Sequence, residues 1–138
     1  MGLSNDERKS VVEYRLSRAK ETLADTAILI DNKMWSIAAN RLYYSCFYAA
    51  SALLMNDGYK AHSHSDVKNV LSLYYIKENK LDKKLIKTYG NLFNMRQRGD
   101  YEDWAIIEEE DILPYLEPTA IFIAEIEKLI NQSTPLSC

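Results

Sequence analysis

A chain of 138 residues with a mass of 16.0 kDa has the size of one domain, because domains usually take roughly 100 to 200 residues. Hydrophobic residues make up 47% and charged residues 27% of the chain, which supplies a core and excludes a disordered protein. No apolar run approaches the roughly 18 residues of a membrane span, and the N-terminus lacks the apolar stretch of a secretion signal, so we expect a cytoplasmic protein.

The residue types predict an all-α fold, because four Gly and three Pro are too few for the turns of an all-β protein. Two cysteines, Cys46 and Cys138, give no disulfide framework, and we expect Cys46 to be a buried small hydrophobic residue. His62 and His64 have no third ligand at a recognisable spacing, so the sequence predicts neither a metal nor a cofactor. It also contains no glycine-rich phosphate loop and no nucleophile elbow, which excludes the common nucleotide hydrolases and serine enzymes.

The net charge of -3 hides an uneven distribution of charge along the chain. Residues 1–59 are balanced, residues 60–101 carry nine basic against four acidic side chains, and residues 102–138 carry one basic against nine acidic side chains. The basic middle segment is either a local phosphate-facing surface or an ordinary solvated helix face.

Two long helices are predicted in the first part of the chain. The first opens at Ser4, where Ser4 and Glu7 have capping-box spacing, and its apolar stripe consists of Val12, Leu16, Ala19, Leu23, Ala27 and Ile30. The second runs from Met34 to about Asp57, and Gly58 can close it. Because its middle is apolar on nearly every side, we expect it to be the central helix.

A third, short helix should follow a loop from Gly58 to Ser65 that carries both histidines, with Ser65 as its cap. Its apolar positions are Val67, Val70, Leu71, Tyr74 and Tyr75. The fourth predicted helix runs from about Asp82 to Arg98 and is ended by Gly99.

The last predicted helix runs from about Glu108 to about Asn131 along Leu116, Ala120, Ile123 and Ile130, and Pro118 should kink or restart it. The sequence therefore indicates one domain over residues 1–131, an up-and-down bundle of about five helices, with a tail at residues 132–138.

The most informative stretch for function lies at the end of the fourth helix. Its apolar stripe (Leu85, Tyr89, Leu92 and Phe93) continues at Arg96, which turns that guanidinium inward, where it needs an anionic partner. In one interpretation Arg96 pairs with Asp100 or Asp103 and fastens the helix end to its loop. In the other, Arg96 and Arg98 present forked donors to a phosphate at a cleft.

A second candidate feature lies on the second helix, where Arg41, Tyr44, Tyr48 and Ser51 follow one another at i, i+3, i+7 and i+10. This polar-tipped line on an apolar helix belongs either to the core or to a ligand cleft. His64 is a candidate for proton transfer near neutral pH, or it packs against the start of the third helix.

These segments resemble the HEPN domain family: the string from Ala38 to Ala50 (AANRLYYSCFYAA), His64, and the string from Arg96 to Tyr101 (RQRGDY). The resemblance covers residues from about 8 to 131. It implies a helical bundle that dimerises and places the ends of the two fourth helices together over a cleft. Many members are ribonucleases of toxin-antitoxin, abortive-infection or CRISPR-linked systems, often encoded beside a small nucleotidyltransferase antitoxin.

The ribonuclease motif of that family is an arginine followed, after four to six residues, by a histidine. The corresponding positions after Arg96 hold Tyr101, Glu102 and Asp103, so the resemblance carries over the arginine but not the histidine, which Tyr101 replaces. The chain is therefore similar to a branch with an Arg-x-x-x-Asp-Tyr signature. Because a phenol titrates near 10, Tyr101 suits a hydrogen bond better than a base, and Asp100 or His64 could substitute as the base.

Two functions stay open on this basis. The first is a dimeric RNA- or nucleotide-binding domain of toxin-antitoxin or defence type, with or without ribonuclease activity from its degenerate motif. Its catalytic candidates are Arg96, Asp100 and Tyr101, and its binding candidates are Arg98, Arg41, Tyr44, Tyr48 and His64. The second is a non-catalytic module that partners a small nucleotidyltransferase, which the missing histidine favours. We expect a homodimer, since the apolar second helix and Trp104 leave apolar surface to cover.

Overall fold

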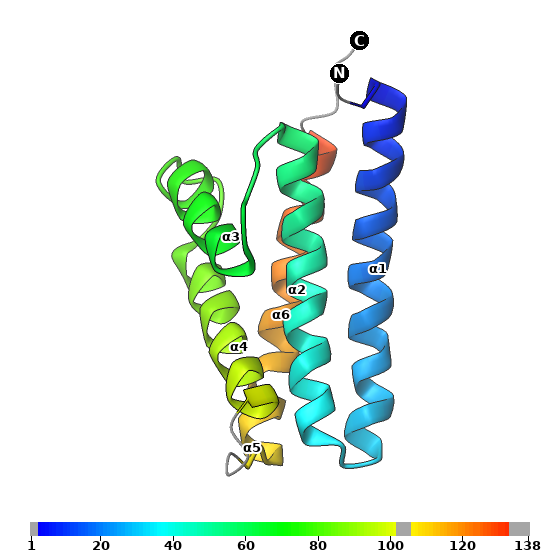
Figure 1. Ribbon diagram of the computed structural model, residues 1–138, viewed down its shortest axis with the longest axis vertical. Coiled ribbons are helices and arrows are strands. Elements are labelled where there is room, and N and C mark those ends of the chain that lie inside the picture. The colour runs from blue at the N-terminus through cyan, green and yellow to red at the C-terminus, as the bar shows by residue number, and fades with distance from the viewer. Residues whose placement is uncertain (1–2, 102–105, 133–138) are drawn as a thin grey trace.

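The computed structural model describes residues 3–101 and 106–132, with the backbone alone at Asp100 and Tyr101. In this part of the chain every regular element is helical, and the long helices run up and down in a bundle (Figure 1). The helices are α1 (Asn5–Asp31), α2 (Trp35–Asp57), α3 (His64–Leu71), α4 (Lys83–Tyr101), α5 (Glu109–Ile112) and α6 (Leu116–Gln132). A π-helical turn (Ser72–Ile76) follows α3, and a 3-10 turn (Leu113–Tyr115) joins α5 to α6. The predicted all-α bundle is confirmed.

The start of α1 is fixed by the predicted capping box: the Ser4 hydroxyl accepts from the Glu7 N–H at 3.1 Å, and the Ser4 N–H donates to the Glu7 carboxylate at 2.8 Å. The expected apolar stripe was wrong at Ala27, which is exposed. The buried line ends instead with Thr22 and Thr26, and the Thr26 hydroxyl donates to the Thr22 carbonyl at 3.0 Å. A threonine satisfied in this way can replace an apolar residue in a core.

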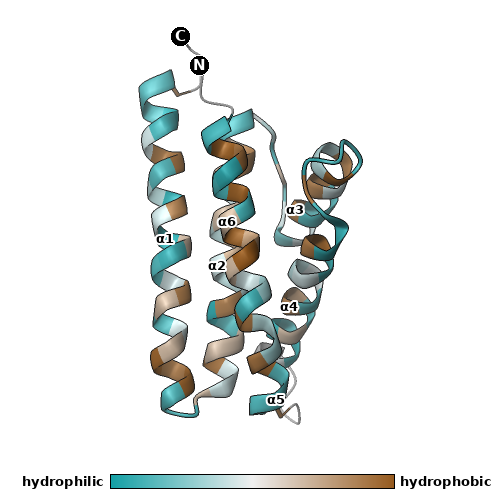
Figure 2. Cartoon of the chain, turned by 180° about the vertical axis from the view of Figure 1, so that it is seen from behind, coloured by the Kyte–Doolittle hydropathy of each residue, from teal (hydrophilic) through white to brown (hydrophobic). Residues whose placement is uncertain are grey.

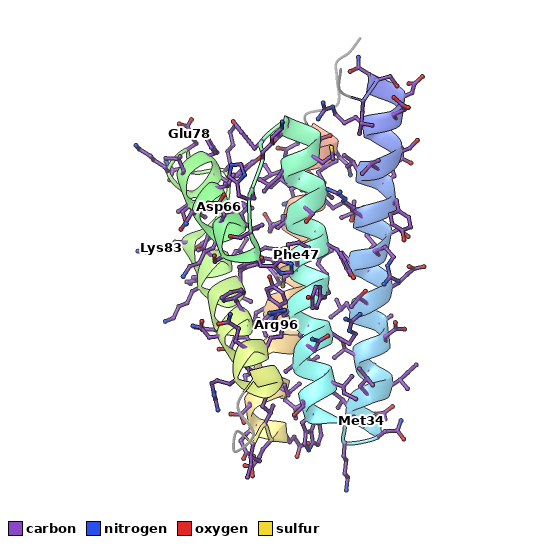
Figure 3. The ribbon with its side chains drawn as sticks, viewed as in Figure 1. Met34, Phe47, Asp66, Glu78, Lys83 and Arg96 are labelled. Carbon is purple, nitrogen blue, oxygen red and sulfur yellow. The ribbon has the colours of Figure 1, made fainter. Side chains whose placement is uncertain are left out.

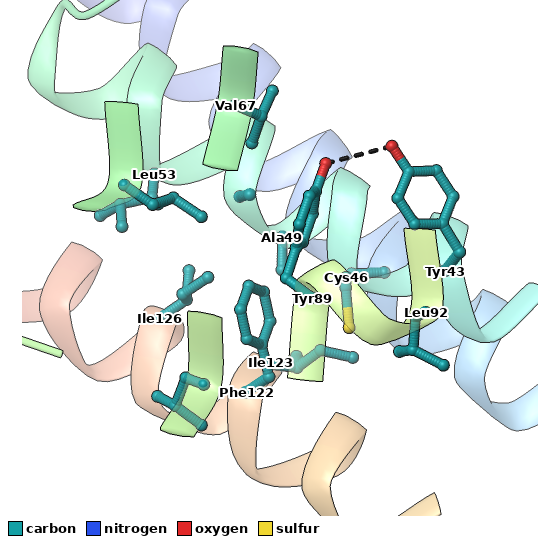
Figure 4. Close-up of a cluster of buried hydrophobic side chains, with 14 of the residues drawn as sticks. Tyr43, Cys46, Ala49, Leu53, Val67, Tyr89, Leu92, Phe122, Ile123 and Ile126 are labelled. Carbon is teal, nitrogen blue, oxygen red and sulfur yellow. Dashed lines mark hydrogen bonds between the residues drawn. The ribbon is translucent and has the colours of Figure 1, made fainter. Parts of the chain in front are cut away.

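Helix α2 is the central helix, as predicted, and it contacts α1, α4 and α6. It ends at Asp57, where Gly58 takes the left-handed conformation with φ of 80°, as expected of a helix-ending glycine. Cys46 is fully buried, and burial raises the pKa of its thiol to about 12. Together with Leu53, Phe122 and Ile126 it belongs to the core between α2, α4 and α6 (Figure 4).

Two helix ends differ from the prediction. Helix α3 is capped by Ser63, whose hydroxyl accepts from the Asp66 N–H at 3.1 Å, so Ser65 is not the cap and His64 lies in the helix rather than in the loop. Helix α4 runs through Gly99 to Tyr101. A Cβ at Gly99 would lie 2.9 Å from the Ile107 Cδ1, so this glycine permits close packing instead of ending the helix.

The last predicted helix is divided into α5 and α6, because the chain forms a 3-10 turn at Pro114. The restart therefore comes two residues before Pro118, which lies in the first turn of α6, where a proline loses no helical hydrogen bond. The expected position Ala120 is exposed, and its neighbours Thr119 and Phe122 are buried instead.

Hydrophilic residues alternate with hydrophobic ones along α1, as expected of a helix with one face in the core (Figure 2). None of these helices combines the length and the apolar character that crossing a membrane requires.

Candidate functional site

Arg96 lies on the α2 side of α4, as its position in the apolar stripe predicted (Figure 3). Its guanidinium carbon is 5.1 Å from the ring centroid of Tyr43, 5.6 Å from that of Tyr44 and 5.9 Å from that of Phe93. Its Nη1 donates a hydrogen bond of 3.1 Å to the Tyr44 hydroxyl. Cation–π contacts of this kind each contribute roughly 0.5 to 2 kcal/mol, so aromatic rings from two helices hold the guanidinium in place.

His64 is the second polar group between α2 and α4. Its ring stacks on Phe47 with centroids 4.1 Å apart and planes at 6°. Its Nδ1 shares a hydrogen bond of 2.7 Å with the Tyr43 hydroxyl, which also lies 3.1 Å from the Tyr89 hydroxyl. The Tyr89 hydroxyl donates at 3.3 Å to the His64 carbonyl, so the network fixes both the backbone and the ring of His64.

The environment of these groups decides which of them exchanges a proton near neutral pH. Burial, and then the positive charge of Arg96, lower the pKa of His64, so its imidazole is neutral at pH 7. Burial raises the pKa of Tyr43 to about 12, and burial raises that of Tyr89 as well. Both phenols therefore stay protonated, and His64 is the group of this network suited to proton transfer.

Three of the other predicted binding residues lie beside Arg96 and His64. The Arg41 guanidinium is 5.2 Å from the Tyr44 ring and donates to the Asn40 side-chain oxygen at 2.8 and 3.2 Å. The Tyr44 ring lies 5.7 Å from that of His64, edge to face, and 5.9 Å from that of Tyr48. The structure thus brings Arg41, Tyr44, Tyr48, His64 and Arg96 together, and we call this set the Arg96 cluster.

Arg98 lies elsewhere, because two residues along a helix turn a side chain by roughly 200°. It is exposed and lines a separate depression of about 480 Å³ with Asn94, Glu110, Asp111 and Tyr115. Within one chain, therefore, Arg96 and Arg98 do not face the same cleft. The side chains of the predicted catalytic residues Asp100 and Tyr101, and all of Asp103 and Trp104, lie outside the described residues, so the predicted pairing of Arg96 with an aspartate stays a prediction.

Sequence reasoning assigned no site role to four aromatic residues that support the Arg96 cluster: Tyr43, Phe47, Tyr89 and Phe93. A signal for them was present, because Tyr43 and Phe47 are four residues apart on α2, and Tyr89, Phe93 and Arg96 follow one another at i, i+4 and i+7 on α4. Two aromatic rows on helices that pack together predict a shared aromatic layer around the arginine.

The chain is also similar to known proteins over most of its length. The model of the HEPN domain matches residues 12–129. A UPF0332 protein of Thermotoga maritima is 36% identical over 126 residues, which cover 91% of this chain and 96% of that protein.

Two proteins of Methanocaldococcus jannaschii are also similar. The one named "Putative toxin MJ0142" is 29% identical over 122 residues, covering 88% of this chain and 83% of its own. The one named "Putative toxin MJ0605" is 26% identical over 131 residues, covering 94% and 96%. The family match spans nearly the whole bundle, including both strings that carried the resemblance, and the chain belongs to the HEPN domain family.

Proposed function

We propose that this protein is a dimeric RNA- or nucleotide-binding domain of a cytoplasmic toxin-antitoxin or defence system, and that Arg96 is its phosphate-binding residue. The observation that carries the proposal is the position of the Arg96 guanidinium beside His64, held by the rings of Tyr43 and Tyr44. An arginine held by aromatic rings keeps its charge while its orientation is fixed in advance, which suits recognition of a phosphate. The names of the two Methanocaldococcus relatives support a toxin role.

The neighbouring imidazole gives the cluster a group for RNA chemistry. Cleavage of RNA by its own 2′-hydroxyl needs an acceptor for that proton near pH 7. His64 meets this need, because its pKa is lowered and its ring is fixed by Phe47 and the Tyr43 hydroxyl. In this proposal Arg96 binds the phosphate, His64 accepts the proton, and Tyr101 and Asp100 belong to the same cleft at the end of α4.

A non-catalytic module is the second candidate function, and the observation that favours it is the tyrosine at position 101, where the family's ribonuclease motif has histidine. In that case the Arg96 cluster is structural, and the protein binds a small nucleotidyltransferase that acts as its antitoxin. The two candidates differ in whether the isolated protein binds RNA.

We expect the protein to form a homodimer through the end of the bundle where α4 ends. The last turns of α1, the start of α2 and α5 lie at this end of the bundle (Figure 2). The exposed hydrophobic residues on these elements and beside them are Ile28, Met34, Ile37, Ile106 and Leu113. Sedimentation equilibrium should give twice the chain mass. Ile37→Asp should produce monomers, whereas Ile121→Asp, at a similarly exposed position on α6, should leave the dimer intact; monomers in the parent protein would contradict the shared cleft.

The parent protein should bind labelled RNA and cleave it slowly or not at all at pH 7, because Tyr101 stands at the position of the motif histidine and a phenol is a poor base there, which leaves His64 as the only proposed proton acceptor. Tyr101→His should raise the cleavage rate, measured by gel electrophoresis of the products. If His64 is the proton acceptor, the cleavage rate should rise as the pH passes through the lowered pKa of His64, because only the neutral imidazole accepts a proton. Cleavage should then be lost in His64→Gln. Fast cleavage that persists in both Tyr101→Phe and His64→Gln would overturn the assignment of these residues.

A further inference from the structure

A groove of about 800 Å³ lies between α1, α2 and the segment that joins α2 to α3. Its lining includes Arg15 and Arg18 from α1, Tyr48 from α2, and Tyr59, Lys60 and His62 from the joining segment. His64 and Phe47 also line it, so the groove reaches the Arg96 cluster at His64. The groove is therefore continuous with the site described above, although most of the residues that line it do not belong to the Arg96 cluster.

The groove is positively charged in a protein whose net charge is -3. Its lining contains three basic side chains besides the two histidines, and none of its described lining residues is acidic. Two carboxylates from outside the lining contact it: Glu21 pairs with Arg18 at 3.5 Å, and Asp66 accepts from the His62 N–H at 3.0 Å. They offset part of this charge, but the three basic side chains still outnumber them. Such a concentration of cations selects an anionic ligand.

The basic side chains are interleaved with aromatic rings. The Arg18 guanidinium lies 5.4 Å from the centroid of Tyr48, and hydrogen bonding to Tyr48 raises the pKa of Arg18 further. Tyr59 stacks on Tyr74 with centroids 4.1 Å apart, which orients its ring at the rim. Cations along a groove together with fixed aromatic rings are the features that bind single-stranded nucleic acid, since the cations bind phosphates and the rings stack on bases. An acidic peptide would use the cations alone.

We propose that this groove binds a single-stranded stretch of RNA, with Arg15, Arg18 and Lys60 on its phosphates and Tyr48 and Tyr59 against its bases. The groove then carries the strand to His64, where the proposed function places the chemistry. This inference rests on that function, and it adds a binding path on α1 that the Arg96 cluster does not require.

The test compares two triple variants with the same loss of charge, using fluorescence anisotropy with a labelled single-stranded oligouridylate. Arg15→Ala/Arg18→Ala/Lys60→Ala removes the groove cations, and Lys83→Ala/Lys84→Ala/Lys87→Ala removes three exposed lysines of α4. We expect the groove variant to lose at least about tenfold in affinity, and its slope of log affinity against log salt to fall by roughly 2, because each phosphate contact contributes about 0.7 in single strands. The lysine control should stay within about twofold of the parent, as its residues lie outside the groove.

Further measurements separate this inference from the proposed function. Arg15→Lys/Arg18→Lys should restore most of the affinity lost with the two alanines, and Lys60→Ala alone provides a variant outside the helices should the triple variant fold poorly. If the parent binds RNA through Arg96, but the lysine control loses as much affinity as the groove variant, the groove proposal is wrong and the proposed function stands. Binding of oligoglutamate as tight as that of the oligouridylate also overturns it, in favour of an acidic peptide. No RNA binding by the parent at all overturns both proposals.

Discussion

Arg96→Ala should lower the affinity for RNA or nucleotide by roughly 10- to 100-fold, because a charge-assisted hydrogen bond to phosphate contributes roughly 1.5 to 3 kcal/mol. The helices should persist, since the substitution removes no core side chain: the guanidinium packs at the edge of the core against Tyr43, Tyr44 and Phe93. Fluorescence anisotropy measures the affinity, and circular dichroism the helical content.

Arg98→Ala is the matched control, because Arg98 is exposed on another side of the same helix and lines a different depression. A much smaller loss of affinity in this variant would place the phosphate at Arg96. A large fall in the melting temperature of Arg96→Ala with unchanged affinity would instead show that the arginine is structural, and would favour the interaction module. Equal losses in both variants would indicate that the end of α4 binds RNA as a whole.

The parts of the fold that local chemistry determines were predictable. The capping box at Ser4 fixes the start of α1 and the left-handed Gly58 fixes the end of α2, both within a residue or two of the prediction. The errors come where a residue acts through tertiary packing. The sequence predicts a helix end at Gly99, but this glycine lies inside α4 and makes room for Ile107, a contact that sequence periodicity does not reveal.

The candidate site was predictable only in part. Arg96 was placed inward by the stripe of α4, and the structure agrees. Phe93 is a local partner, three residues earlier on α4, but Tyr43 and Tyr44 lie about fifty residues earlier in the chain, so their contact with Arg96 depends on the packing of α2 against α4.

The basic residues of the groove could not be predicted from the sequence, for a different reason. Residues 1–59 are balanced in charge, and this average conceals that Arg15 and Arg18 share the face of α1 toward the groove. The basic middle segment that the sequence emphasised contributes Lys60, while Lys83, Lys84 and Lys87 are exposed on α4 away from the groove lining. Helical position, rather than segment charge, distinguishes a solvated helix face from a binding surface.

Phe122→Ala should cause the largest loss of stability among these variants. Phe122 is fully buried, and its ring packs against Tyr89 with centroids 6.0 Å apart, between α2, α4 and α6 (Figure 4). Removing a buried phenylalanine side chain costs roughly 3 to 5 kcal/mol, against a total of about 5 to 15 kcal/mol for a whole domain. We expect the melting temperature to fall by at least about 10 °C.

Ile121→Ala is the control for this prediction, because Ile121 is the preceding residue of α6 and is 43% exposed, so the melting temperature should change by only a few degrees.

The RNA affinity of Phe122→Ala shows whether the core beneath His64 also matters for binding. Tyr89 connects Phe122 to the hydroxyl of Tyr43 and the carbonyl of His64, so a cavity at Phe122 loosens the network that fixes His64. Because Tyr44 and Phe93, which lie outside this hydrogen-bond network, also hold Arg96, RNA affinity at 10 °C, where the variant stays folded, should fall less in Phe122→Ala than in Arg96→Ala. A larger fall would mean that the orientation of His64 matters more for RNA binding than the charge of Arg96.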